Sequence, residues 1–272
     1  MSFYFGKRLT NGEITISTKF VGKILCSIML ISWAFVILYG LFIESNKHQR
    51  RPTIEACPAD FSKDLRLATF SSLITTDTSI TKWIWRMAIS MTSGLRLFYV
   101  PVVFFTTHKS ALQAYLTSIM SVFENIGIMG LTFMLDTKPY TLYQKVNRGQ
   151  GYQSLNKSEK QLYFPDQFDI SGDFHYMWFS WWAIGSLVVF TIFAHNNKRI
   201  GTLTLAYFFV GVTTVTCFFV RIKNCIGYIW TIYAMSEYCM VLLAICINSV
   251  ILVDIYGQHR LVLTSTEGHV GE

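Results

Sequence analysis

The chain alternates between long apolar segments and the polar stretches that separate them. About 20 consecutive apolar residues are needed for a helix to cross the hydrocarbon core of a bilayer. Six segments reach that length, at residues 21–43, 83–105, 111–135, 176–194, 200–220 and 226–253. Because backbone groups in a membrane must be satisfied internally, and no strand-length alternation is present, we predict an all-α fold. The expected architecture is a six-helix transmembrane bundle that forms a single domain over residues 1–272.

The composition supports a membrane protein. Of the 272 residues, 52% are hydrophobic and 14% are charged, whereas a soluble domain carries roughly 25% charged residues. A net charge of +7 can indicate a nucleic-acid partner, but the basic residues lie in tails and loops, where they set topology or meet lipid headgroups. We therefore expect no nucleic-acid partner. The chain has no Walker loop, no G-x-S-x-G, no H-E-x-x-H and no C-x-x-C, so neither a cofactor nor a metal is predicted.

The start of the chain indicates the orientation. The first apolar segment begins about twenty residues in and has no clear small-residue cleavage site, which is typical of an uncleaved signal anchor. With the N-terminus inside, six spans place both termini in the cytosol and make residues 136–174 a long lumenal loop. Cys57 and Cys225 then lie on the lumenal side, either as a disulfide or as two free thiols. Asn156 begins a glycosylation sequon, Asn-Lys-Ser, that faces the same side.

Three full charges interrupt the apolar segments: Arg96, Glu124 and Glu237. An ionised side chain near the membrane centre costs a few kcal/mol or more, so such residues usually face a bundle interior and mark a site. At about 1.5 Å of rise per residue, each charge lies in or close to the middle third of the hydrocarbon core. We therefore expect one cluster of an arginine and two carboxylates. One interpretation makes all three residues catalytic, and the other makes them a helix-packing ion pair.

A second set of basic side chains lies nearer the predicted lumenal surface: Arg86, Arg221, Lys223 and His175. A guanidinium at that level can bind the phosphate of a lipid headgroup through two parallel hydrogen bonds. We therefore treat Arg86, Arg221 and His175 as candidate headgroup-binding residues. The alternative is that each side chain reaches to ordinary headgroups at the interface, as long basic side chains commonly do.

Four short stretches around these residues resemble a known family. They are Ile84-Trp85-Arg86, Arg96-Leu97-Phe98, Val122-Phe123-Glu124-Asn125 and Ile232-Tyr233-Ala234-Met235-Ser236-Glu237-Tyr238. In this order they resemble the post-GPI-attachment-to-proteins factor two family, which belongs to the broader FRAG1/DRAM/Sfk1 group of six-span membrane proteins. The resemblance runs from Cys57 to the segment at 261–265, which is most of the chain. Cys57 and Cys225 also stand where the family has lumenal cysteines.

The resemblance implies a role in fatty-acid remodelling of GPI anchors, in the membrane of the Golgi apparatus or of the endoplasmic reticulum. The family is associated with reacylation of a lyso-GPI intermediate with a saturated chain. GPI or lyso-GPI is therefore the expected lipid partner, while the acyl donor and any partner subunit stay unidentified. The resemblance carries functional positions over to Arg96, Glu124 and Glu237 in the core and to Arg86 and Arg221 near the lumenal face.

The chain also departs from the family. Thr92 and Ile222 stand where the family has histidine, and the third loop is much longer. Two classes of function are left open. The first is a lipid acyltransferase or its essential subunit, with Glu124 or Glu237 accepting a proton from the lyso hydroxyl. The second is a non-enzymatic organiser of lipids or of partner assemblies, as in other members of the broader group. A transporter is less favoured, because neither an inverted repeat nor paired broken helices are present.

Overall fold

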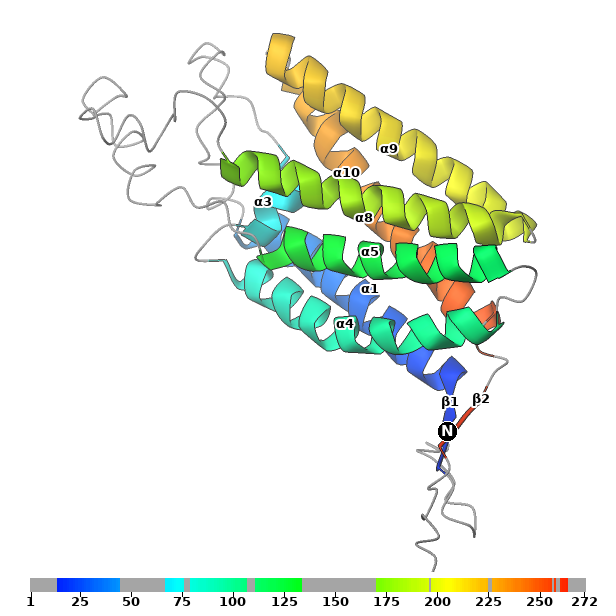
Figure 1. Cartoon of the computed structure of the whole chain (residues 1–272). Helices are drawn as coiled ribbons and strands as arrows, with labels where there is room; N and C mark the ends of the chain where they lie inside the picture. Colours follow the sequence, from blue (N-terminus) through cyan, green and yellow to red (C-terminus); the bar gives the residue numbers. More distant parts are fainter. Residues whose placement is uncertain are drawn as a thin grey trace, which may run out of the picture.

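Six long helices make up most of the structure. The computed structural model describes residues 14–44, 67–75, 79–106, 111–133, 170–195, 197–224, 227–255, 257 and 260–263. The long helices are α1 (Thr18–Phe42), α4 (Ile80–Thr106), α5 (Ala111–Phe133), α8 (Ile170–Ala194), α9 (Lys198–Asn224) and α10 (Gly227–Ser249). They run alongside one another in a single bundle (Figure 1). The predicted all-α class is confirmed for the described residues.

The helices pack in an order that closes on itself. Each long helix contacts the next one along the chain, from α1 through α4, α5, α8 and α9 to α10, and α10 returns to α1. Neighbours in sequence are therefore neighbours in space, as is usual for helical bundles. Buried side chains meet inside this ring. They include Leu25, Met29, Ile89, Phe190 and Ile247.

Five helical segments are long and apolar enough to cross a membrane. They are Thr18–Phe42, Ala111–Phe133, Met177–Ala194, Lys198–Val220 and Tyr228–Ile255. By helix length and hydropathy, the protein is therefore a multi-pass membrane protein. The helix that covers the predicted span at 83–105 is α4, which is not among these five. With 27 residues, α4 is about 40 Å long at 1.5 Å of rise per residue, so it matches the length of its neighbours.

The contact between α5 and α8 depends on glycine. A Cβ atom built on Gly127 would lie 2.4 Å from the backbone nitrogen of Trp182, and one on Gly185 would lie 3.0 Å from the backbone nitrogen of Glu124. Small residues let two transmembrane helices approach backbone to backbone, and association in lipid relies on such van der Waals contact. This contact fixes where Glu124 sits in the ring. α8 also begins at Ile170, so the end of the predicted loop 136–174 is helical.

A buried carboxylate joins α1 to α4. Glu44, just beyond the end of α1, is 3% exposed. Its carboxylate accepts hydrogen bonds from Ser79 Oγ at 2.7 Å and from the backbone N–H of Ile80 at 3.1 Å. The first N–H groups of a helix have no partner within the helix and favour negative charge nearby. Glu44 therefore caps α4 and holds its first residue beside the end of α1.

Short elements complete the described part. β1 (Ile14–Ser17) and β2 (Arg260–Leu263) form an antiparallel ribbon in which Ile14 pairs with Leu263 and Ser17 with Arg260. A six-residue helix, α3 (Phe70–Thr75), lies between α1 and α4 in the chain, and a π-helix, η4 (Val250–Ile255), continues α10. The sequence predicted neither the strands nor α3, because four to six residues are too few for hydrophobic periodicity to be distinguished. η4 overlaps the end of the predicted span at 226–253, and only its π geometry was not predicted.

The glycine contact gives a first prediction. Gly127→Ala places a methyl group against the backbone of Trp182, so the two helices must separate. We expect the free energy of unfolding to fall by about 1–3 kcal/mol, as for other overpacked interiors. Unfolding of the purified protein in micelles measures this change. Gly94→Ala is the matched control, because a Cβ there meets nothing within 4 Å. Equal stability of the two variants would contradict a close α5–α8 contact.

Candidate functional site

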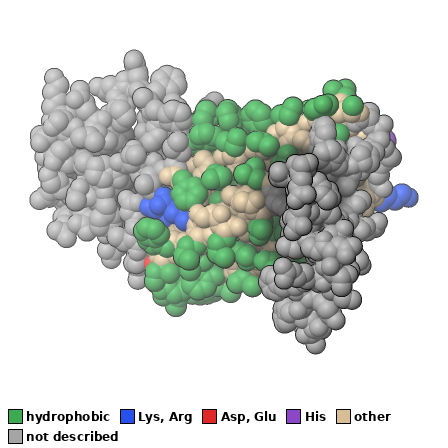
Figure 2. Space-filling model, turned by 60° about the horizontal axis from the view of Figure 1, so that its bottom comes forward, with side chains coloured by type: hydrophobic (Ala, Val, Ile, Leu, Met, Phe, Trp, Pro, Cys, Tyr) green, Lys and Arg blue, Asp and Glu red, His purple; other side chains and the backbone are tan. Residues whose placement is uncertain are grey.

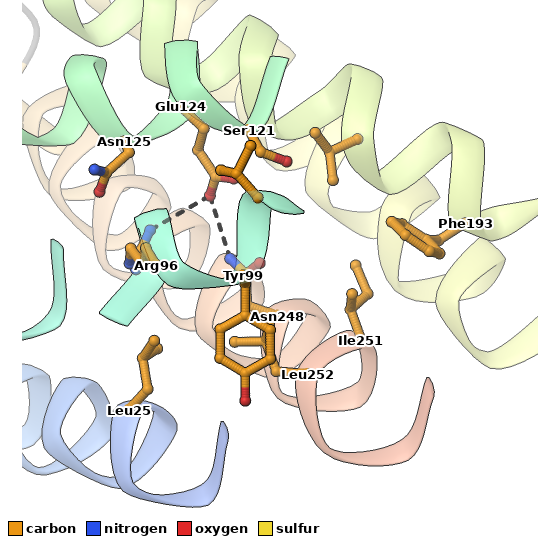
Figure 3. Close-up of a pocket in the computed structure, with 12 residues that line it drawn as sticks. Leu25, Arg96, Tyr99, Ser121, Glu124, Asn125, Phe193, Asn248, Ile251 and Leu252 are labelled. Carbon is orange, nitrogen blue, oxygen red and sulfur yellow. Dashed lines mark hydrogen bonds and ion pairs between the residues drawn. The ribbon is translucent and has the colours of Figure 1, made fainter. Parts of the chain in front are cut away.

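Arg96 and Glu124 form an ion pair inside the bundle. Arg96 Nη1 lies 3.6 Å from Glu124 Oε1, and the two side chains are 14% and 7% exposed. Asn248 on α10 donates from Nδ2 to the same oxygen at 3.3 Å. Figure 3 shows the three side chains pointing toward one another from α4, α5 and α10. The structure thus brings two of the three predicted charges together and adds Asn248, which the sequence suggests only as a packing or boundary residue and not as part of the site.

A small polar cavity adjoins this pair. Its volume is about 50 Å³, which is room for three to five water-sized groups at roughly 10–15 Å³ each. Two buried polar atoms in its wall, Arg96 Nε and Asn125 Oδ1, make no hydrogen bond within the described residues. The wall is formed by Leu25, Arg96, Tyr99, Val100, Ser121, Glu124, Asn125, Val189, Phe193, Asn248, Ile251 and Leu252. A bulky lipid headgroup does not fit this volume.

The π-helix η4 supplies one wall of the cavity. Ile251 and Leu252 belong to it and line the cavity. The backbone of η4 comes close to α1, because a Cβ on Gly22 would lie 3.0 Å from the carbonyl oxygen of Leu252. On the other side, the hydroxyl of Tyr99 donates to the carbonyl of Thr18. A π turn is a rare distortion that often occurs at functional sites, and here it widens the helix beside Asn248.

Glu237 lies elsewhere in the bundle. Its Oε2 accepts the backbone N–H of Ser71 at 3.1 Å, and its Oε1 accepts the Ser71 hydroxyl at 3.0 Å. On α10 it is eleven residues before Asn248, which corresponds to about 16 Å of helix rise. The predicted cluster of three charges is therefore wrong. Depth along a helix follows from sequence, but the partner that a side chain meets depends on how the helices pack.

Glu237 and two aromatic residues of α10 hold the segment that leads into α3. Trp230 Nε1 donates to the carbonyl of Leu67 at 2.8 Å, and the Tyr238 hydroxyl donates to the carbonyl of Ala68. Non-helical backbone at membrane depth is tolerated only where protein groups satisfy it. Glu237, which is 6% exposed, satisfies the first turn of α3. Residues 67–74 mix Leu, Ala, Phe and Ile with Thr and Ser, so no continuous apolar run marks this segment as buried.

An apolar cleft lies beside Glu237. It has a volume of about 40 Å³. Its lining residues come from α3, α4, α5, α8 and α10: Phe70, Ser71, Ile74, Trp85, Ile128, Leu131, Thr132, Phe179, Trp182, Glu237, Met240 and Val241. The hydroxyl of Thr132 is satisfied by the carbonyl of Ile128 at 2.7 Å. Glu237 and Ser71 are thus the main polar feature of an otherwise hydrophobic wall.

Arg86 lies at the rim of this cleft. Its Nε donates to the carbonyl of Thr132 at 3.2 Å. The centre of its guanidinium lies 6.0 Å from the ring of Trp83 and 5.7 Å from the ring of Phe133. Aromatic rings at this distance attract a cation through their electron-rich faces. The structure therefore fixes the position of one predicted headgroup-binding residue.

Several predicted site residues lie outside what the structure describes. Cys57, Cys225 and Asn156 are outside the described residues, so the disulfide and the glycosylation site stay predictions. Arg221 and His175 belong to α9 and α8, but their side chains are not described. The four cysteines that are described, Cys26, Cys217, Cys239 and Cys246, are free thiols.

Thr92 is buried in α4 at a position where the resemblance expects histidine. Its hydroxyl donates to the carbonyl of Ala88 at 2.8 Å, one turn back in the same helix. A hydroxyl used in this way packs against its own helix, and it offers no base that could take the place of an imidazole. The side chain of Ile222, the second departure from the family, is not described.

Comparison of the chain with protein-family models, with curated proteins and with solved structures found no match. Among the described residues, no group of three or more His, Cys, Asp or Glu side chains could hold a metal ion. The chemistry of the site therefore has to be argued from its own side chains.

The ion pair gives a second prediction. Arg96→Gln and Glu124→Gln each leave one buried charge without its partner, so we expect each to lose about 3–5 kcal/mol of stability. The double variant is expected to lose less than the sum, with a coupling of about 0.5–3 kcal/mol. Unfolding of the purified variants measures both quantities. Asp254→Asn is the control, because its pair with Arg199 is long, at 3.9 Å, and solvent-accessible. Simple additivity of the two losses would contradict a direct Arg96–Glu124 interaction.

Proposed function

We propose that the protein takes part in fatty-acid remodelling of GPI anchors in the Golgi or endoplasmic reticulum membrane, reacylating a lyso-GPI intermediate or serving a partner that does so. The resemblance described from the sequence motivates this function. The observation that supports it best is the position of Glu237: a buried carboxylate in the wall of an apolar cleft, with Arg86 at the rim of that cleft. Lipid chemistry needs a polar reacting group beside space for an apolar chain.

The proposed reaction needs one proton acceptor. An ester bond forms between the lyso hydroxyl oxygen and the acyl carbon, while the bond between that carbon and its donor, an acyl thioester or an ester lipid, breaks. The hydroxyl proton passes to a carboxylate and then to the leaving group. Glu237 suits this role better than Glu124, because Glu237 lies in an apolar wall and its partner there is the neutral Ser71, whereas Glu124 is paired with the charged Arg96 and bound by Asn248.

We also propose the finer topology of six spans with both termini in the cytosol. α4 is as long as its neighbours, and an even number of crossings returns the chain to its starting side. The pairing of β1 with β2 agrees with this topology, because the strand before the first helix and the strand after the last helix lie at the same end of the bundle.

The topology gives a third prediction. Epitope tags at the two ends of the chain are expected to face the cytosol. Protease should therefore digest both tags once the plasma membrane is selectively permeabilised, while the membrane of the organelle stays intact. An engineered or native sequon near Asn156 is expected to carry a glycan, detected as a mobility shift removed by glycosidase. Opposite behaviour of the two tags would rule out an even number of spans.

The proposed chemistry gives a fourth prediction. Glu237→Gln is expected to leave a folded protein and to cause accumulation of lyso-GPI, measured by mass spectrometry of GPI anchors from cells that carry only the variant. Asp254→Asn, which changes an exposed carboxylate in η4, is the control and should remodel normally. Normal remodelling of GPI anchors by a folded Glu237→Gln variant would show that Glu237 is not the proton acceptor.

The second candidate function is a non-enzymatic membrane organiser. It is favoured by the Arg96–Glu124 pair, which is buried and joined by Asn248, as expected of an ion pair that holds helices together. An organiser depends on the shape of the bundle alone. In the same lipid assay, full remodelling by Glu237→Gln together with normal remodelling by the Arg96→Gln, Glu124→Gln double variant would favour this function over catalysis.

A further inference from the structure

The apolar cleft and the Arg86 guanidinium lie next to each other. Thr132 connects them, because it lines the cleft and its carbonyl oxygen accepts the Nε–H of Arg86 at 3.2 Å. Trp85, the residue before Arg86, forms another part of the cleft wall and is 2% exposed. A positive charge is therefore held directly beside a hydrophobic cleft.

Two aromatic rings hold that charge at the surface of the bundle. The rings of Trp83 and Phe133 flank the guanidinium, and these residues are 62% and 41% exposed. Figure 2 shows one face of the molecule, on which hydrophobic side chains cover most of the described surface and Lys or Arg atoms gather toward the ends. A guanidinium has five donors in a plane, which suits two parallel hydrogen bonds to a phosphate.

The walls of the cleft have the chemistry of acyl chains. Phe70, Ile74, Leu131, Phe179 and Val241 supply aromatic and aliphatic surface from four helices. Burial of each methylene group of a chain against such a surface contributes about 0.8 kcal/mol relative to water. A helix with its side chains is about 10–12 Å across, so a space of about 40 Å³ excludes a protein helix and takes only something as thin as the end of a chain.

The length of chain that enters depends on α3. An apolar cavity of roughly 150 Å³ takes a benzene ring of six carbons, so the present space of about 40 Å³ holds one or two terminal carbons. Phe70 and Ile74 are the α3 residues in the wall. A longer stretch of chain therefore requires α3 to move outward, against the hydrogen bonds that Ser71 makes with Glu237.

We propose that Arg86 and the apolar cleft form one binding site for an anionic glycerophospholipid, with the lipid phosphate on the guanidinium and the end of one acyl chain in the cleft. The inference rests on the proposed function, because it names the place where the lipid substrate binds. Charge complementarity selects an anionic amphiphile over a neutral one.

The acyl-chain half of the site is tested by photolabelling. The full-length protein is placed in nanodiscs that contain phosphatidylinositol with a diazirine near the end of one chain, and labelled residues are identified by mass spectrometry. We expect labels on cleft residues such as Leu131 and Phe179. Val241→Phe fills space equivalent to about two methylene groups and is expected to lower cleft labelling about tenfold. Val212→Phe, on the exposed face of α9, is the matched control and should leave labelling unchanged.

The headgroup half is tested separately, so that the inference stays falsifiable if Val241→Phe does not fold. Native mass spectrometry compares bound phosphatidylinositol with bound phosphatidylcholine. Arg86→Gln is expected to lower the preference for the anionic lipid about tenfold, which is the change in affinity that the loss of one charge-assisted hydrogen bond causes. Arg86→Lys is expected to lower it less, because it keeps the charge but loses the planar donors. Arg199→Gln, a highly exposed arginine, is the control.

The outcomes separate this site from the proposed function. Labelling confined to the cleft, and reduced in Val241→Phe, supports the site whatever the remodelling assay shows. Labels spread evenly over all helices, or an anionic preference unchanged in Arg86→Gln, would overturn the site even if Glu237→Gln blocks remodelling. Capture of a protein segment in the cleft in place of lipid would overturn it as well.

Discussion

Satisfaction of backbone polar groups in an apolar medium is the constraint on which this structure depends. Long helices satisfy it by themselves, but residues 67–69 and the N-termini of α3 and α4 bring further unpaired backbone groups into the bundle. Two buried carboxylates meet this need: Glu44 accepts the first N–H of α4, and Glu237 accepts the N–H of Ser71 in α3. Without such acceptors, each unsatisfied group would cost several kcal/mol in lipid. Buried acidic residues are here part of how the chain turns.

Glycine contacts and the ion pair are parts of one arrangement. Gly185 brings α8 against the backbone of Glu124, and this sets the position from which the carboxylate reaches Arg96 and Asn248. A charge pair at this depth is weak evidence for stability by itself, since desolvation offsets much of the attraction. Its effect is on the orientation of the helices, because a rotation of α4 or α5 that separates the pair leaves a buried charge without its partner.

The sequence predicted the helices well and the site in part. An apolar segment of twenty or more residues is stable in lipid as a helix, so the spans and the all-α class follow from length and hydropathy. Arg96 and Glu124 were recognised because a charge there has to be compensated. The position of Glu237 was missed, because its partner Ser71 lies in a segment too short for periodicity to reveal, and no local pattern shows that residues 67–75 enter the bundle. Asn248 was missed for a related reason: its role depends on the packing of α10 against α5.

The ribbon of β1 and β2 has a consequence beyond the bundle. Because Ile14 is paired with Leu263, the chain before the first helix and the chain after the last one leave the bundle from the same point. Segments that are held together at one point have a high local concentration relative to each other. A partner that binds both tails therefore gains avidity from the ribbon, and one that separates them must first break its hydrogen bonds.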